Sequence, residues 1–246
     1  MIKRLPLPCI PLYLALSASV SNASINIVLD YGATSAADVV TYGAAFNAAE
    51  TFWESNLSGY RDGLLAPTSV IMNVALGNID GAGGTLGSAG PTQVNIQGNF
   101  LETTQGNMTF DTSDLGSSVS AGTFEAVIRH EMAHVLGFGS LWSSSAVGLP
   151  GYQEVYVNGS GQYTGAFGLA AFQQEFDQAD ATYVPIELDG AAGTANGHWN
   201  MGIDLGAEFE AVDSRDDPGD TIVYTSVFNG KVLDNELMTG FLSGDA

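Results

Sequence analysis

The chain has 246 residues, of which 45% are hydrophobic, so it can form one sizeable core or two subdomains around a cleft. Its 27 acidic residues outnumber 6 Lys and Arg, which gives a formal net charge of -21. A surface this acidic repels phosphate backbones, so we exclude nucleic acid as a partner, and the apolar content excludes disorder across most of the chain.

The N-terminus has the features of an export signal. A short basic start precedes an apolar run from Leu5 to Val20, and Ser21-Asn22-Ala23 resembles a small-residue cleavage site. We therefore expect residues 1–23 to be a signal peptide and the mature protein to be secreted and extracellular. The one cysteine, Cys9, lies within this segment, so the mature chain would carry no disulfide. No later stretch stays apolar over about 18 residues, so we expect no membrane span in the mature chain.

The pattern of apolar residues between positions 25 and 139 predicts a mixture of strands and helices. The expected elements are strands at 25–31, 69–77, 92–98 and 108–110, helices at 35–57 and from 121–123 onward, a Gly-rich loop at 78–91 and a turn at 111–114. This order is typical of an α+β fold in which a mixed twisted sheet carries two main helices above a cleft. We assign residues 24–139 to an N-terminal subdomain.

The second predicted helix contains His130-Glu131-Met132-Ala133-His134. Residues four apart lie on one face of an α-helix, so both imidazoles can bind one Zn²⁺ from the same side. Only 3 histidines occur in the chain, so a chance match is improbable. Glu131 need not bind the metal and can accept a proton from metal-bound water. Gly137 follows where the helix would end through a left-handed residue.

Residues 140–246 are predicted to form an irregular, loop-rich C-terminal subdomain. Within it we expect irregular structure at 143–168, a short helix at 169–176 and an extended segment at 184–188. Four aspartates lie between Asp213 and Asp220 around a Pro-Gly pair. We interpret them as a solvated loop, because their spacing does not match an EF-hand, and a Ca²⁺ site is the alternative.

A catalytic zinc needs three protein ligands and an open position. His198 is the only histidine outside the helix motif and lies 64 residues after His134. Glu154, 20 residues after His134, could instead complete a His₂Glu site. Gly137 and the lack of a helical pattern around Glu154 favour His198 as the third ligand.

Four segments carry a resemblance to a known family. They are HEMAHVLGFG at 130–139, Leu141-Trp142, Gly197-His198-Trp199 and Glu236-Leu237-Met238-Thr239-Gly240. Together they resemble the leishmanolysin-like metzincins, especially the secreted bacterial members, over roughly residues 25–240. The loop from Asp80 to Thr92 and the run Thr109-Phe110-Asp111 also resemble this family. Compact metzincins carry the third histidine where this chain has Ser140, whereas the leishmanolysin group inserts a long segment before it.

The resemblance implies a zincin-like fold and endopeptidase activity on extended peptides. It implies that His130, His134 and His198 are zinc ligands, that Glu131 is the catalytic base, and that Met238 is the Met-turn residue beneath the metal. Against the family pattern, residues 201–232 look inserted between His198 and Met238. The chain also ends eight residues after Met238, before the helix that usually follows, as in a truncated gene product or a fragment.

We therefore predict a secreted zinc-dependent endopeptidase that hydrolyses peptide bonds of extended protein or peptide substrates. The substrate would lie along an edge strand, and the candidates are Gln93–Gly98 and Met108–Phe110. Two alternatives are a non-catalytic secreted zinc-binding or surface protein and a His₂Glu metallopeptidase that uses Glu154.

Overall fold

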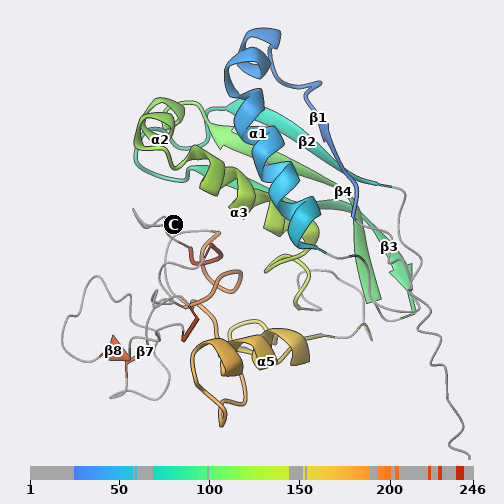
Figure 1. Ribbon diagram of the computed structural model, residues 1–246, viewed down its shortest axis with the longest axis vertical. Helices are drawn as coiled ribbons and strands as arrows, with labels where there is room; N and C mark the ends of the chain where they lie inside the picture. The colour runs from blue at the N-terminus through green and yellow to red at the C-terminus, as the bar shows by residue number, and fades with distance from the viewer. Residues whose placement is uncertain are drawn as a thin grey trace, which may run out of the picture.

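The computed structural model describes residues 25–57, 59, 69–98, 100–143, 152, 154–188, 193–200, 203–204, 221–222, 227–228 and 237–240. These residues form a mixed α+β fold with four helices and a four-stranded mixed sheet (Figure 1). The expected signal peptide at 1–23 and the acidic run at 213–220 lie outside the described residues. None of the described helices combines the length and apolar character that crossing a bilayer requires.

The main sheet has the strand order β1-β2-β4-β3. Its strands are β1 (Ile27–Asp30), β2 (Val70–Gly77), β3 (Gly87–Gln97) and β4 (Phe100–Asp111). The first two strands and β4 run parallel, whereas β3 is antiparallel to β4. Within the described residues, β3 therefore forms one edge of the sheet and β4 is an interior strand.

Two helices, α1 (Ala36–Asn56) and α3 (Phe124–Leu136), lie across the same face of this sheet (Figure 1). Ser35 caps the first helix by accepting a hydrogen bond from the Asp38 backbone N–H at 3.2 Å. Phe46 of α1 is buried and meets the rings of Phe110 and Phe124 edge to face, with centroids 5.3 and 5.8 Å away. This aromatic contact joins both helices to β4.

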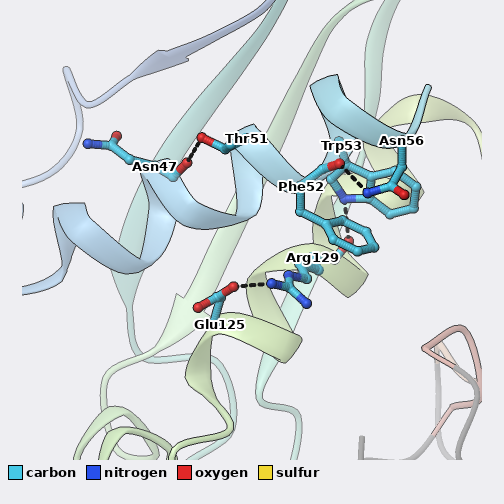
Figure 2. Close-up of polar contacts among 7 residues, drawn as sticks. All are labelled: Asn47, Thr51, Phe52, Trp53, Asn56, Glu125 and Arg129. Carbon is cyan, nitrogen blue, oxygen red and sulfur yellow. Dashed lines mark hydrogen bonds and ion pairs between the residues drawn. The ribbon is translucent and has the colours of Figure 1, made fainter. Parts of the chain in front are cut away.

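A second contact between the two helices fixes α3 next to its first histidine. The indole N–H of Trp53 on α1 donates to the backbone carbonyl of Arg129 at 3.0 Å. The guanidinium of Arg129 forms an ion pair with Glu125 and lies 4.2 Å from the ring centroid of Phe52 (Figure 2). Because Arg129 directly precedes His130, these contacts help to set the rotation of α3 about its axis.

The helix that ends at Leu136 stops as the sequence predicts. Gly137 has a φ of 113°, and the backbone N–H groups of Gly137 and Phe138 close the end of the helix. Its N–H donates to the His134 carbonyl at 3.2 Å, and the Phe138 N–H donates to the Ala133 carbonyl at 2.9 Å. This pattern of a left-handed residue and two backward hydrogen bonds ends many helices.

Several predicted elements are confirmed and others need correction. The helix expected at 35–57 is α1, and the strand expected at 69–77 is β2. The Gly-rich loop is shorter than predicted because β3 begins at Gly87, and the strand expected at 108–110 is the end of a 12-residue strand. The helix α2 (Leu115–Ala121) was not predicted. Its sequence LGSSVSA contains mostly poor helix formers, so local propensity gives little signal there.

The C-terminal half contains shorter elements below the sheet and its helices (Figure 1). They are β5 (Gln162–Tyr163), α5 (Ala166–Glu175), β6 (Val184–Pro185), β7 (Ile203–Asp204) and β8 (Thr221–Ile222). The short helix therefore begins three residues earlier than predicted, and the extended segment at 184–188 contains β6. A small apolar cluster of Phe172, Phe176 and Val184 holds α5 against β6.

Candidate metal centre

Three imidazole rings meet beneath the sheet layer, and two of them come from successive turns of α3. His130 and His134 are four residues apart, and their ring centroids are 4.7 Å apart. The Nε2 atoms of the two rings are 3.0 Å apart. The helix geometry alone therefore brings these two nitrogens together, as the sequence predicts.

The third ring comes from a loop 64 residues further along the chain. The Nε2 atom of His198 lies 3.0 Å from the Nε2 atom of His130 and 3.0 Å from that of His134. The ring of His198 stacks on that of His130 at a centroid distance of 5.0 Å. The structure therefore places the predicted third histidine at the other two.

Two glycines let the His198 loop approach the end of α3 closely. Gly139 has a φ of 68°, and a methyl group on it would lie 2.3 Å from the carbonyl oxygen of Gly197. Only a residue without a side chain fits this contact between two backbone segments. The close approach brings His198, the next residue after Gly197, to the histidines of the helix.

An aromatic cluster packs beside this contact. Trp199 follows the third histidine and stacks on Trp142 at a centroid distance of 5.0 Å. It also meets Phe138 at 4.8 Å and Tyr163 at 5.3 Å. The cluster joins the segment after α3, the strand β5 and the His198 loop, so burial of large apolar rings holds the third histidine in place.

A turn at residues 237–240 closes the other side of the site. The backbone carbonyl of Leu237 is 2.7 Å from the Nδ1 atom of His130, and that of Met238 accepts from the Trp199 N–H at 3.0 Å. A methyl group on Gly240 would lie 2.3 Å from the Thr194 side chain and 3.5 Å from the His198 ring. Met238 itself is buried. One short turn thus contacts the first histidine, the third histidine and the aromatic cluster.

Backbone carbonyls fix the protonation state of each ring nitrogen. The Nδ1 atoms of His130, His134 and His198 lie 2.7, 2.9 and 2.8 Å from the carbonyl oxygens of Leu237, Phe138 and Thr194. A carbonyl can only accept, so each Nδ1 must carry the hydrogen. Each neutral ring therefore directs the lone pair of its Nε2 atom toward the other two.

This donor set fits a metal ion. Three lone pairs 3.0 Å apart repel one another unless a cation lies among them. The centre of such a triangle is about 1.7 Å from each nitrogen, close to the usual Zn–N distance of about 2.0–2.1 Å, so the spacing of the nitrogens suits such an ion. The described residues offer one group of three or more possible ligands, and it consists of these histidines. The cluster could therefore hold a metal ion.

Burial keeps the three rings neutral. Together with the neighbouring imidazoles, it lowers the pKa of His130 to about 3 and that of His198 to about 4. Burial also lowers the pKa of His134. Neutral imidazole is the form that binds metals, so the environment prepares the rings for coordination.

Glu131 lies beside the three rings and is 5% exposed. Burial raises the pKa of its carboxyl group to about 8, because the charged form loses water. A cation on the neighbouring nitrogens would oppose this shift by favouring the carboxylate. Glu131 therefore suits proton transfer near neutral pH.

The histidines and Glu131 line an open cavity of about 700 Å³. The cavity is also lined by residues 86–89 at the start of the edge strand, by the His198 loop and by the 237–240 turn. A substrate in the cavity would therefore reach both the three nitrogens and the carboxyl group.

The candidate edge segments for the substrate need correction. Met108–Phe110 belongs to β4, which has a strand on both sides, so its backbone groups are already paired. Gln93–Gly98 lies largely in the edge strand but does not line the cavity. The segment that does so is Leu86–Ala89, which contains the first three residues of β3.

Of the two candidates for the third ligand, only His198 lies with the helix histidines. Glu154 is exposed and is not part of the three-residue group. The supporting carbonyls of Leu237, Phe138 and Thr194 were not predicted from the sequence. Backbone groups carry no residue-type signal, so no pattern in the sequence could have identified them.

No family model matches the chain, and no curated protein matches it by sequence.

Proposed function

We propose that this protein is a secreted, zinc-dependent endopeptidase with a zincin-like fold. The observation that carries the proposal is the convergence of three unprotonated Nε2 atoms beside the buried carboxyl group of Glu131 in one open cavity. Three histidines with an open position are a typical ligand set for a catalytic zinc. The leishmanolysin-like motifs support the same assignment, and His130, His134 and His198 would hold the ion.

Bound Zn²⁺ would supply a Lewis acid that polarises the scissile carbonyl and makes water acidic enough to lose a proton near pH 7. Side-chain and backbone groups of the chain would move the proton and orient the histidines. An Oε atom of Glu131 takes a proton from the attacking water and later gives it to the nitrogen of the leaving amine. The Nδ1 hydrogen bonds to Leu237, Phe138 and Thr194 orient the three rings and keep the hydrogen of each ring on Nδ1, which leaves Nε2 free to bind the ion.

The edge strand would orient the substrate. The Asp111 N–H donates to the Leu86 carbonyl at 3.0 Å, so the backbone groups of Leu86 point toward β4. In an antiparallel pair the backbone groups alternate in direction, so those of Gly87 and Ala89 face the open edge. An extended peptide could pair with these groups by strand addition and lie in the cavity.

The proposal is tested by removing the base while keeping the metal ligands. Glu131→Gln is expected to keep one zinc per chain and to lower kcat for a casein-derived peptide by about 10²–10⁴-fold. Zinc content by elemental analysis and peptide cleavage by mass spectrometry give the two readings. Wild type that binds one zinc, yet shows no cleavage that a chelator inhibits, would favour a non-catalytic zinc-binding protein.

Two alanine variants provide the control for the third ligand. His198→Ala should lose zinc, because it removes one of the three converging nitrogens. Glu154→Ala should keep it, since Glu154 is exposed and apart from the cluster. The opposite result would support the His₂Glu alternative.

A further inference from the structure

The first residue of the edge strand lies directly against the carboxyl group of Glu131. A methyl group on Gly87 would be 2.6 Å from the Oε1 atom of Glu131 and 2.8 Å from both its Cδ and Cγ atoms. Real carbon atoms do not approach this closely, so any side chain at position 87 would force the carboxyl group to move.

The backbone does not explain the glycine at this position. The structure has many glycines in the left-handed region, but Gly87 is not one of them, so its backbone angle suits any residue. Gly90 lies three residues later in the same strand, and a methyl group on it would meet nothing within 4 Å. The tight contact is therefore specific to Gly87, and what occupies the space is the side chain of Glu131.

A displaced Glu131 carboxyl group has space to enter. Its side chain is 5% exposed and lines the cavity together with Gly87 and the three histidines. A methyl group at 87 would shift the carboxyl group within this cavity, and the contact is with the end of a flexible side chain rather than with backbone. The shift would cost the fold little but would move the proton acceptor relative to the three nitrogens.

We propose that Gly87 is a positioning residue that sets the place of the Glu131 carboxyl group from the edge strand. The proposal rests on the endopeptidase function proposed above. The missing side chain at 87 lets the strand that would bind the substrate lie directly against the base. Gly87 thus sets the distance between the backbone of the bound substrate peptide and the carboxyl group of Glu131.

The test compares two alanine substitutions in one strand. Gly87→Ala should keep one zinc per chain and an unchanged KM, while kcat falls by about 100-fold, the effect of displacing a reacting group by about 1 Å. Gly90→Ala, which does not line the cavity, should leave zinc, KM and kcat as in wild type. Wild-type kcat in Gly87→Ala, or an equal loss in both variants, would overturn the proposal.

Thermal unfolding supplies a reading that does not depend on catalysis. Alanine is more favourable than glycine within a strand, so Gly87→Ala should raise Tm when Glu131 is first replaced by alanine. In the presence of Glu131, the steric conflict should cancel or reverse this gain, whereas Gly90→Ala should raise Tm in both backgrounds. An equal effect of Gly87→Ala in both backgrounds would show that the two residues do not interact, and would overturn the proposal. If wild type cleaves no peptide, the proposed function fails, and the unfolding data still show whether the contact exists.

Discussion

At the scale of single residues, the site depends on polar side chains that are held in place by hydrogen bonds to backbone groups. Each histidine has a carbonyl partner at Nδ1, so no ring is free to turn. A buried carboxylate outside the cavity lining, that of Asp111, fixes a loop in a similar way. The Oδ2 atom of Asp111 accepts from the N–H groups of residues 79, 80 and 81 at 2.9, 2.9 and 3.0 Å, and its Oδ1 atom accepts from Ser113 at 2.7 Å. Asp111 thereby holds the loop before β3, which lines the cavity at Asp80.

The Asp111 carboxylate predicts a specific dependence of stability on pH. The four backbone hydrogen bonds, with that of Ser113 the strongest, hold its pKa well below the usual range. Its contribution to stability is therefore fully present above the unfolded pKa of about 4 and is lost as pH falls below that value. Asp111→Asn should lower Tm at pH 7, and the difference from wild type should shrink below about pH 4. Asp180→Asn, at an exposed position, is the control and should change Tm little at any pH. A wild-type Tm for Asp111→Asn at pH 7 would contradict the argument.

At the scale of elements, the site is a junction between the end of α3 and two later segments. The helix supplies two of the three histidines, and its terminal turn at Gly137–Gly139 directs the chain so that Gly139 touches Gly197. The 237–240 turn then contacts the first histidine and the segment of Trp199. The third histidine, His198, is thus placed by backbone contact and aromatic packing, not by the helix.

Gly139→Ala should therefore weaken metal binding. Its methyl group would lie 2.3 Å from the Gly197 carbonyl oxygen and 2.8 Å from its Cα atom, and backbone cannot yield as a side chain can. We expect zinc affinity to fall about 10–100-fold, the range for changes that misplace a ligand from outside the coordination shell. Isothermal titration with zinc measures the loss.

Gly122→Ala is the matched control for that experiment. Gly122 also has a positive φ, at 77°, and follows a helix, but a methyl group on it meets nothing within 4 Å. It therefore carries the backbone strain of a left-handed alanine without the contact. Equal zinc affinity in the two variants would show that the Gly139–Gly197 contact does not place His198.

How far the sequence predicts this site depends on the range of the interaction involved. His130, Glu131 and His134 follow from helix periodicity, which is local. His198 follows from the scarcity of histidine rather than from any pattern around it. The contact of Gly87 with Glu131 and the carbonyl of Leu237 at His130 are tertiary, so no local pattern predicts them. The same holds for the first part of β3, before the predicted strand at 92–98, where glycines and a proline give weak strand propensity and pairing with β4 establishes the strand.

At the scale of the whole molecule, the three histidine Nε2 atoms meet where two halves of the chain with separate apolar cores come together. The sheet, α1 and α3 share one buried apolar cluster, while the side chains of Trp142, Tyr156 and Ile186 form another in the C-terminal half. His130 and His134 belong to the first half, and His198 to the second. An ion among them would bind the folded arrangement and not the unfolded chain, so it would stabilise the fold by mass action.

Removal of the metal should therefore lower the thermal stability of the whole chain. At a free zinc concentration of 100 times Kd the stabilisation is about 2.7 kcal/mol, which corresponds to a Tm shift of about 5–11 °C for a chain of this size. Calorimetry of the wild type with zinc and with a chelator measures the shift. Glu131→Gln keeps all three ligands and should show the same shift, whereas His198→Ala should show little, because it has lost the nitrogen from the second half. A wild-type Tm that does not respond to the chelator would mean that no ion joins the two halves. The repulsion of the three facing lone pairs would then have to be relieved in some other way.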